Sequence, residues 1–364
     1  MSRYPITVEY NHDLAVSEKF LEAFPTLRVA LRDQRLIEAF QFYDREAKKH
    51  KRLFHFFGVS SLFVGLITLA ASACEVMIGR SFSDIIGTGT IFVEFGSVAS
   101  ILLVIWSRIG GHRARWCQSV FHRERLRQWH FQQFLDGQLI SLLPERADEF
   151  QKELDRRRET MLQGFRDGFG AMSAFVHSGS QRDDLFHQMT PYSDSKLLTT
   201  VLEAMRILRF DHQLAYGQRK IAAEGESPSL ALEEHAGLSE IVASTTLAGA
   251  VAVGALAFFA SLIEANPSLG AHWNFPVASR ILGGLSLLLA VVSAASRAYQ
   301  AGFTLPDEIE SYEEYCSRIR EFKTVLDSDT SNAEKHRQLE HLETEAILEL
   351  RRFLRMKLRA TFIF

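Results

Sequence analysis

The sequence has few cysteines and almost no charge across four long stretches. Only three cysteines occur in 364 residues, at positions 74, 117 and 316. They lie far apart and form no Cys-x-x-Cys pair, which argues against a disulfide framework or a structural zinc site. The sequence also lacks the Gly-x-Ser-x-Gly, His-Glu-x-x-His and phosphate-loop patterns of common enzymes. We therefore expect no metal, no cofactor and no enzymatic activity.

Four apolar stretches are long enough to cross a membrane, since a bilayer core about 30 Å thick needs roughly 20 helical residues. They cover residues 53–73, 88–107, 241–263 and 277–296, and their only charged residues are Glu94 and Arg280. The sequence predicts an all-α integral membrane protein with four transmembrane helices, arranged as two hairpins with long cytoplasmic helices. A large soluble core of buried helices is the alternative.

Lysine and arginine are distributed unevenly around the first hairpin. Five basic residues lie within 45–52 and six arginines lie within 108–127, whereas the intervening loop, 74–87, has one. The positive-inside rule then places the loop outside and the flanking segments in the cytoplasm. We expect a multi-pass protein of the cell (inner) membrane with cytoplasmic N- and C-termini.

The order of a helix, two spans and a second helix occurs twice along the chain. On this basis the chain divides into an N-terminal segment at 1–28, a first two-span hairpin with entry and exit helices at 29–136, a cytoplasmic helical connector at 137–194, a second two-span hairpin with flanking helices at 195–327, and a C-terminal helix at 328–364. Whether the second hairpin is a true repeat of the first stays open.

Two small groups of residues within the spans are candidates for function and assembly. A carboxylate in hydrocarbon costs a few kcal/mol unless it faces water or a partner. Glu94 shares a helix face with Ser97 and Ile101, so these residues are candidates for lining an oligomeric pore. The alternatives are a protonated Glu94 near the interface, or a span that is shifted by one turn toward Ile101. Ala250 and Gly254 lie four residues apart in the third span and are candidates for a close helix crossing.

Arginines dominate the segment that follows the second span. As candidates for binding an anionic ligand or lipid we take Arg113, Arg115, Arg123, Arg125 and Arg127. Three interpretations stay open: attraction to anionic lipids, recognition of nucleotide phosphates by the guanidinium forks, and pairing with the acidic residues of 307–314.

Two short-looped spans followed at once by a basic, aromatic exit helix give the chain a family resemblance. Trp106-Ser-Arg108, followed by Arg123-Glu-Arg-Leu-Arg-Gln-Trp-His-Phe131, resembles the SLATT domain, the two-transmembrane effector domain associated with SMODS nucleotidyltransferases and SLOG sensors. A similar second copy, around 296–322, is acidic where the first is basic, which puts a shared ligand site in doubt. The likeness covers about 30–135 and 210–327.

The resemblance implies a membrane effector of a bacterial antiphage conflict system, with no catalytic residues. Such a protein is expected to oligomerise and to perturb or permeabilise the membrane on a cytosolic signal. Its expected partners are copies of itself, membrane lipids, and a nucleotide second messenger or an associated sensor or nucleotidyltransferase, with no direct binding of nucleic acid. The alternative is a non-conducting membrane scaffold that recruits partners through its cytoplasmic helices.

Overall fold

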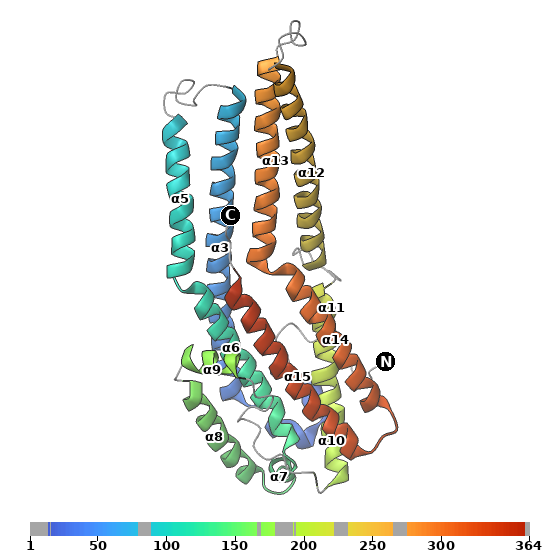
Figure 1. Cartoon of the computed structure of the whole chain (residues 1–364). Coiled ribbons are helices and arrows are strands. Elements are labelled where there is room, and N and C mark those ends of the chain that lie inside the picture. The colour runs from blue at the N-terminus through green and yellow to red at the C-terminus, as the bar shows by residue number, and fades with distance from the viewer. Residues whose placement is uncertain are drawn as a thin grey trace. The chain divides into compact units, whose positions relative to one another are not determined.

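The computed structural model describes residues 14, 16–78, 89–165, 169–178, 192, 194–221, 232–264 and 275–360, and these residues contain helices and no strand (Figure 1). The predicted all-α class is therefore confirmed for this part of the chain. The elements are α1 (Glu18–Ala23), η1 (Pro25–Leu27), α2 (Arg28–Leu31), α3 (Gln34–Ile78), α5 (Gly89–Ile109), α6 (His112–Gln132), η2 (Gln133–Leu135), α7 (Gly137–Ser141), α8 (Ala147–Gly164), α9 (Phe169–His177), α10 (Ser195–Met205), η4 (Arg206–Asp211), α11 (His212–Ile221), α12 (Leu232–Glu264), α13 (Phe275–Phe303), α14 (Leu305–Asp327) and α15 (Asn332–Arg359).

Two compact units make up the fold, and each combines stretches that are distant in sequence. Unit 1 comprises Met1–His50, Ala114–Ala231 and Asp307–Leu358, and unit 2 comprises Lys51–Arg113, Leu232–Pro306 and Arg359–Phe364. The predicted spans fall in unit 2, whereas the segments that flank the two hairpins fall largely in unit 1. The five segments predicted from the sequence follow one another along the chain. Each compact unit instead combines parts of several of these segments.

Local signals explain where several helices begin. The carboxylate of Asp33 accepts a hydrogen bond from the backbone N–H of Leu36 at 3.1 Å and so caps the start of α3. Helix α3 continues without a break from Gln34, in the region predicted as the entry helix, through the first span. At the other hairpin, Thr304 has a φ of 53° and separates α13 from α14. Pro306 and two acidic residues then occupy the first turn of α14, which favours a helix start there.

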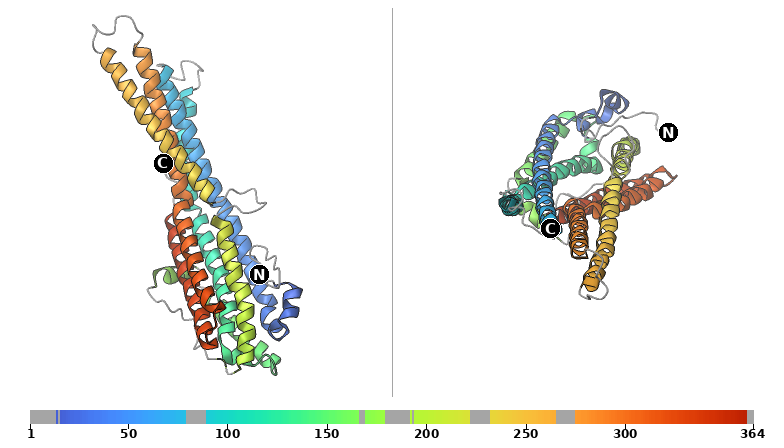
Figure 2. Two further views of the ribbon diagram at one scale, coloured as in Figure 1. Left: turned by 90° about the vertical axis from the view of Figure 1, so that its right-hand side faces the viewer. Right: turned by 90° about the horizontal axis from the view of Figure 1, so that it is seen from above.

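Helices within unit 2 pack closely through small residues and hydroxyl groups. Helices α12 and α13 lie side by side (Figure 2), and Ser286 and Ser293 of α13 each donate a hydrogen bond of 2.8 Å to a backbone carbonyl of α12. Ser100 of α5 likewise donates to the carbonyl of Ser61 in α3 at 3.2 Å. Small residues and interhelical hydrogen bonds are typical of helices that pack in lipid.

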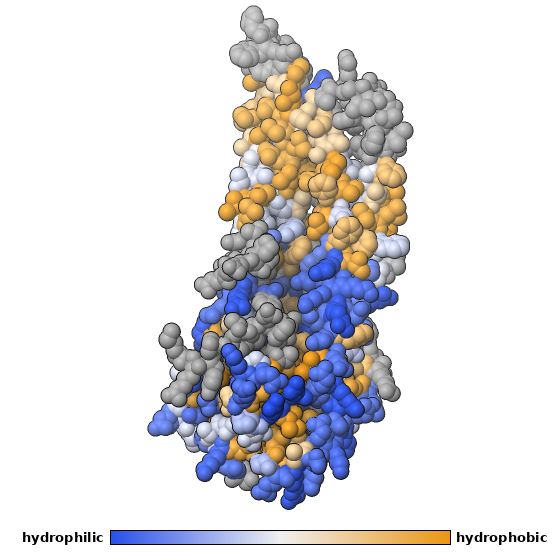
Figure 3. Space-filling view, turned by 180° about the vertical axis from the view of Figure 1, so that it is seen from behind, coloured by the Kyte–Doolittle hydropathy of each residue, from blue (hydrophilic) through white to orange (hydrophobic). Residues whose placement is uncertain are grey.

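Large apolar side chains cover the outside of unit 2. Phe95 is 72% exposed, Val251 67% and Phe56 64%, and Figure 3 shows such apolar residues gathered over the helices of this unit. Monomeric soluble proteins rarely expose contiguous apolar patches of this kind. The outer surface of unit 2 therefore resembles one that lipid covers.

Three stretches in the described part of the chain are long and apolar enough to cross a membrane: Gln34–Cys74, His235–Ile263 and Val277–Asp327. They contain the first, third and fourth predicted spans and indicate association with a membrane. Helix α5 coincides with the second predicted span, 88–107, but its crossing of the membrane stays a prediction, as do the four-span arrangement and the orientation of the termini.

Unit 1 has its own apolar core, built from α1, α2, the beginning of α3, α6 to α8, α10, η4, α14 and α15. Phe131, Phe134, Phe150 and Phe210 are among its fully buried side chains. Burying a large apolar side chain contributes roughly 1.5–3 kcal/mol. The predicted connector, 137–194, takes part in this core through α7 and α8, so it is an integral part of a folded unit.

Candidate functional site

A cavity of about 80 Å³ lies within unit 1, between α6, η4, α11, α14 and α15. Its walls bring together side chains from segments far apart in sequence: Val120, Arg123, Glu124, Arg127, Gln128, Arg209, His212, Gln213, Tyr216, Tyr312, Tyr315, Ala346, Glu349, Leu350 and Phe353. The side chains of Arg123 and Glu124 are 16% and 20% exposed. The cavity wall is therefore partly open to solvent.

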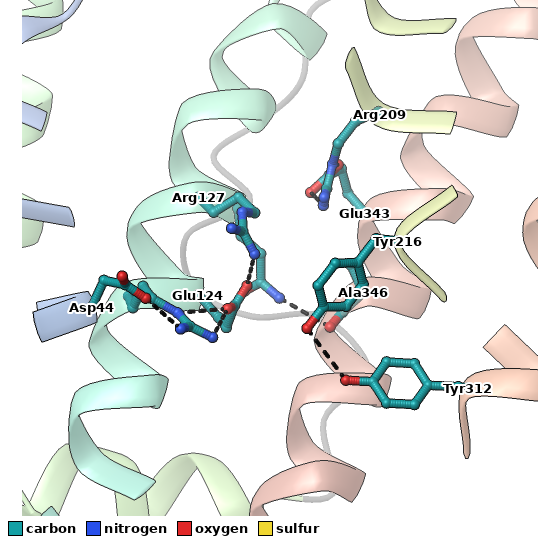
Figure 4. A network of polar contacts seen from close by, with 10 residues as sticks. Asp44, Glu124, Arg127, Arg209, Tyr216, Tyr312, Glu343 and Ala346 are labelled. Atoms are coloured by element: carbon teal, nitrogen blue, oxygen red, sulfur yellow. Dashed lines mark hydrogen bonds and ion pairs between the residues drawn. The ribbon is translucent and has the colours of Figure 1, made fainter. Parts of the chain in front are cut away.

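One wall carries an ion-pair chain that begins on α6 and reaches Asp44 of α3 behind the wall (Figure 4). Arg123 donates to Asp44 at 2.8 Å and to Glu124 at 2.9 and 2.7 Å, and Arg127 donates to the other oxygen of Glu124 at 2.6 Å. Burial alone would raise the pKa of Glu124, but the two arginines outweigh it and lower that pKa below its usual value. Glu124 is therefore ionised and holds both guanidiniums in place.

Arg209 of the opposite wall belongs to a second, more deeply buried pair, which joins η4 to α15. Arg209 donates to Glu343 through Nε at 2.7 Å and through Nη2 at 3.1 Å, and both side chains are 3% exposed. This two-point contact fixes the plane of the guanidinium, which also lies 4.7 Å from the ring centre of Phe131. Arg209 sits in a π-helical segment, a local distortion that often marks functional positions.

Tyrosines and one unusual carboxyl group complete the cavity. The hydroxyl oxygens of Tyr216 and Tyr312 lie 3.5 Å apart, and burial raises the pKa of Tyr312 well above its usual value. Burial, together with the negative charges of Glu124 and Glu308, raises the pKa of Glu349 to about 8. Glu349 is therefore largely a neutral carboxylic acid near pH 7.

Among the residues that line the walls, guanidiniums outnumber ionised carboxylates. At neutral pH the wall residues supply three guanidiniums, from Arg123, Arg127 and Arg209, against the single ionised carboxylate of Glu124. The other two carboxylates of the network belong to Asp44 and Glu343, which are not wall residues. Phenol, amide and guanidinium groups around a small cavity suit the binding of an anion with several oxygen acceptors.

The five arginines predicted from the sequence do not form one site. Arg123 and Arg127 line the cavity. Arg125 is buried, donates to Gln128 at 3.0 Å and lies over the ring of Phe175. Arg113, in unit 2, donates to the carbonyl of Ala360, and Arg115 is exposed on α6.

The acidic residues of 307–314 find cationic partners on α14 and α15. Glu308 pairs with Lys357, and Glu314 pairs with Arg318 and Arg352. The pairs with Lys357 and Arg352 join α14 to α15 within unit 1, and the pair with Arg318 lies within α14. Charge complementarity was expected for this segment, but the observed partners of these two residues lie outside α6.

The candidates within the spans all lie in unit 2. Ser97 and Ile101 are exposed on α5; Glu94 lies in the same helix, but its side chain is outside the described residues. Ala250 is 6% exposed and its carbonyl accepts from Ser286 of α13. A Cβ added at Gly254 would lie 3.0 Å from the hydroxyl oxygen of the same serine. The small-residue face therefore packs against the neighbouring helix of its own chain.

Sequence reasoning missed the wall opposite α6. Arg209 lies in an otherwise apolar run, Ile207-Leu-Arg-Phe210, and Glu343 lies on the apolar stripe of α15 beside Leu342. A charged residue on a buried helix face signals a buried partner. Both Arg209 and Glu343 are charged residues of this kind. The pattern predicts that each has a buried partner, but it does not predict that they pair with each other.

No family model, no curated protein and no solved structure matches this chain. The interpretation of the cavity and of the apolar helices therefore depends on their geometry and chemistry.

Proposed function

We propose that this chain is a membrane effector of a bacterial antiphage or conflict system, which oligomerises and permeabilises the cell membrane when unit 1 receives a cytosolic signal. The apolar surface of unit 2 is the observation that carries the proposal. The resemblance to SLATT domains supplies the biological setting.

The surface of unit 2 has the character of a lipid-facing bundle. Its exposed large side chains, such as Phe63, Phe95 and Val251, would each recover roughly 1.5–3 kcal/mol by leaving water. Inside the unit, hydroxyl groups and glycines mediate the helix contacts, as with Ser286 against Ala250. A helix bundle in lipid is expected to have apolar side chains on its outside and small or polar side chains at its internal contacts.

A separate folded unit with a cavity lined by charged side chains supports an effector that responds to a signal. An anchor alone needs no such unit, whereas a triggered protein needs a place where a signal binds. Four helices enclose no wide channel, so permeation requires several copies of the chain. The exposed face of α5 that carries Ser97 and Ile101 is the candidate for lining the path, together with Glu94.

Ion flux through liposomes tests this function. The purified full-length chain is reconstituted, and cation and anion fluxes are compared between the wild type and Glu94→Gln, with Glu310→Gln as a control at an exposed position on α14. Rings of carboxylates favour cations, so we expect flux that prefers cations, a weaker preference in Glu94→Gln, and no change in Glu310→Gln.

The remaining outcomes separate the competing functions. Flux of unchanged selectivity in Glu94→Gln would remove this residue from the path while keeping permeabilisation. No flux from correctly inserted wild-type protein, in the presence of cell extract as a source of the signal, would contradict permeabilisation and favour the non-conducting scaffold.

A further inference from the structure

We propose that the cavity between α6, η4, α11, α14 and α15 binds a small oxyanion of the phosphate class and is the place where unit 1 receives its signal. The role as a trigger rests on the proposed function, whereas binding of the anion does not.

Charge is the first argument for an anion. Arg123, Arg127 and Arg209 reach the cavity from two opposing walls, and Glu124 is the one wall carboxylate that is ionised at neutral pH. Partly buried charges interact more strongly than charges in water because the local dielectric constant is lower. Asp44 and Glu343 balance part of this charge from behind the walls. An anion is therefore favoured because the groups that face the cavity itself are mostly guanidiniums.

The carboxylates outside the cavity hold the guanidiniums in position. Asp44 contacts Arg123, and Glu343 contacts Arg209 in a bidentate pair, and neither acid is a wall residue. Arg127 is held in the same way by Glu124 and lies 5.1 Å from the ring centre of Phe40. The cationic side chains are therefore preorganised, which reduces the entropy that a ligand must overcome on binding.

Size restricts the ligand. A cavity of about 80 Å³ exceeds the roughly 10–15 Å³ that one water needs and leaves room for a few water-sized atoms. A phosphate group fits this space, while the rest of a larger phosphate ester would have to extend through the open side. Guanidinium groups and phosphate oxygens match in geometry, and the side chains of Tyr312 and Tyr315 also line the cavity.

Glu349 gives the site a dependence on pH. Within unit 1 it is influenced by Glu124 and Arg127 of α6, Glu308 of α14 and Arg352 of α15, and it shares the cavity wall with Arg209, His212, Tyr312 and Tyr315. As a neutral acid Glu349 adds a donor to the wall, whereas in its ionised form it adds a negative charge that repels an anion. Its pKa of about 8 predicts that affinity for an anion declines above that pH.

Binding to the purified full-length chain in detergent tests the inference by calorimetry. Inorganic phosphate is the probe for affinity, and sulfate, whose charge is constant above neutral pH, is the probe for the pH dependence. We expect both anions to bind, chloride at the same ionic strength not to compete, and sulfate affinity to fall up to about tenfold per pH unit above pH 8.

Four variants locate the site. Arg127→Gln should weaken phosphate binding about tenfold or more, and Tyr312→Phe, which removes one hydroxyl, should weaken it severalfold even if the arginine variant folds poorly. Glu349→Gln should bind with an affinity that no longer changes between pH 7 and 9. Arg115→Gln, on the exposed side of the same helix α6, should bind as the wild type does.

Two further arms identify the source of the phosphate group. A nucleoside monophosphate tests a soluble phosphate ester, and vesicles of phosphatidylglycerol test a lipid headgroup. If the ester binds and Arg127→Gln weakens its binding, the signal is a soluble molecule. If Arg127→Gln weakens only the binding to vesicles, a soluble signal is ruled out. No phosphate or sulfate binding by the folded wild type, or an equal loss in Arg115→Gln, would overturn the site itself. Binding without liposome flux would instead contradict the proposed function alone.

Discussion

The buried pair between Arg209 and Glu343 makes a quantitative prediction about unit 1. Glu343→Gln keeps the size of the side chain and removes its charge, leaving the guanidinium of Arg209 without its carboxylate at a position where both side chains are 3% exposed. Removing one partner of a buried pair costs about 3–5 kcal/mol. For a unit of this size that loss corresponds to a decrease in Tm of roughly 6–20 °C. Thermal unfolding followed by circular dichroism in detergent measures it.

A double variant and a surface control make the measurement specific. In Arg209→Met with Glu343→Leu both charges are absent, so we expect most of the stability to return, and the difference from the single variants gives the coupling energy. The control is Glu149→Gln, because Glu149 and its partner Arg146 are 60% and 61% exposed and such pairs contribute about 0–1 kcal/mol. If Glu343→Gln unfolds at the same temperature as Glu149→Gln, the buried pair does not stabilise unit 1.

Three further predictions concern packing and pH. Gly217→Ala would place a Cβ 2.3 Å from the sulfur of Cys316, so we expect a loss of about 1–3 kcal/mol, which Cys316→Ala in the same chain should relieve in a thermal unfolding assay. Gly254→Leu should separate α12 from α13 and yield misassembled protein by size-exclusion chromatography; an unchanged elution profile would show that this crossing is dispensable. Burial lowers the pKa of His122 from 6.5 to about 4, so the unfolded chain takes up a proton before the folded chain does, and stability should fall as pH decreases between these values. In denaturant unfolding, the stability of His122→Phe should therefore decrease less between these pH values. If wild type and variant show the same dependence of stability on pH, His122 is not the group responsible.

Hydropathy and helical periodicity predicted most of the secondary structure. The third and fourth spans lie inside α12 and α13, and the C-terminal segment predicted as a helix, 328–364, contains α15 at Asn332–Arg359. Local patterns did not predict the grouping into two units, since that depends on packing between residues far apart in sequence. The buried faces of α8, for example, meet a core to which α1, α10 and α15 also contribute.

The cavity could be predicted only in part. Arg123 and Arg127 are four residues apart and share one helix face, while Arg125 lies two residues from each and points elsewhere. Spacing alone therefore could have separated Arg125 from the site. Arg209 and Glu343 are 134 positions apart, and no local pattern shows that such residues meet.

Accessibility of single cysteines tests most directly whether unit 2 spans the membrane while unit 1 stays on the cytoplasmic side. In a variant without native cysteines, one cysteine is placed in turn at Ser83, at Ser268 and at Ser178, the first two of which lie outside the described residues. An impermeant maleimide on intact cells should label positions 83 and 268, and should label position 178 only after the cells are broken. Labelling of position 178 in intact cells, with the other two protected, would contradict this arrangement.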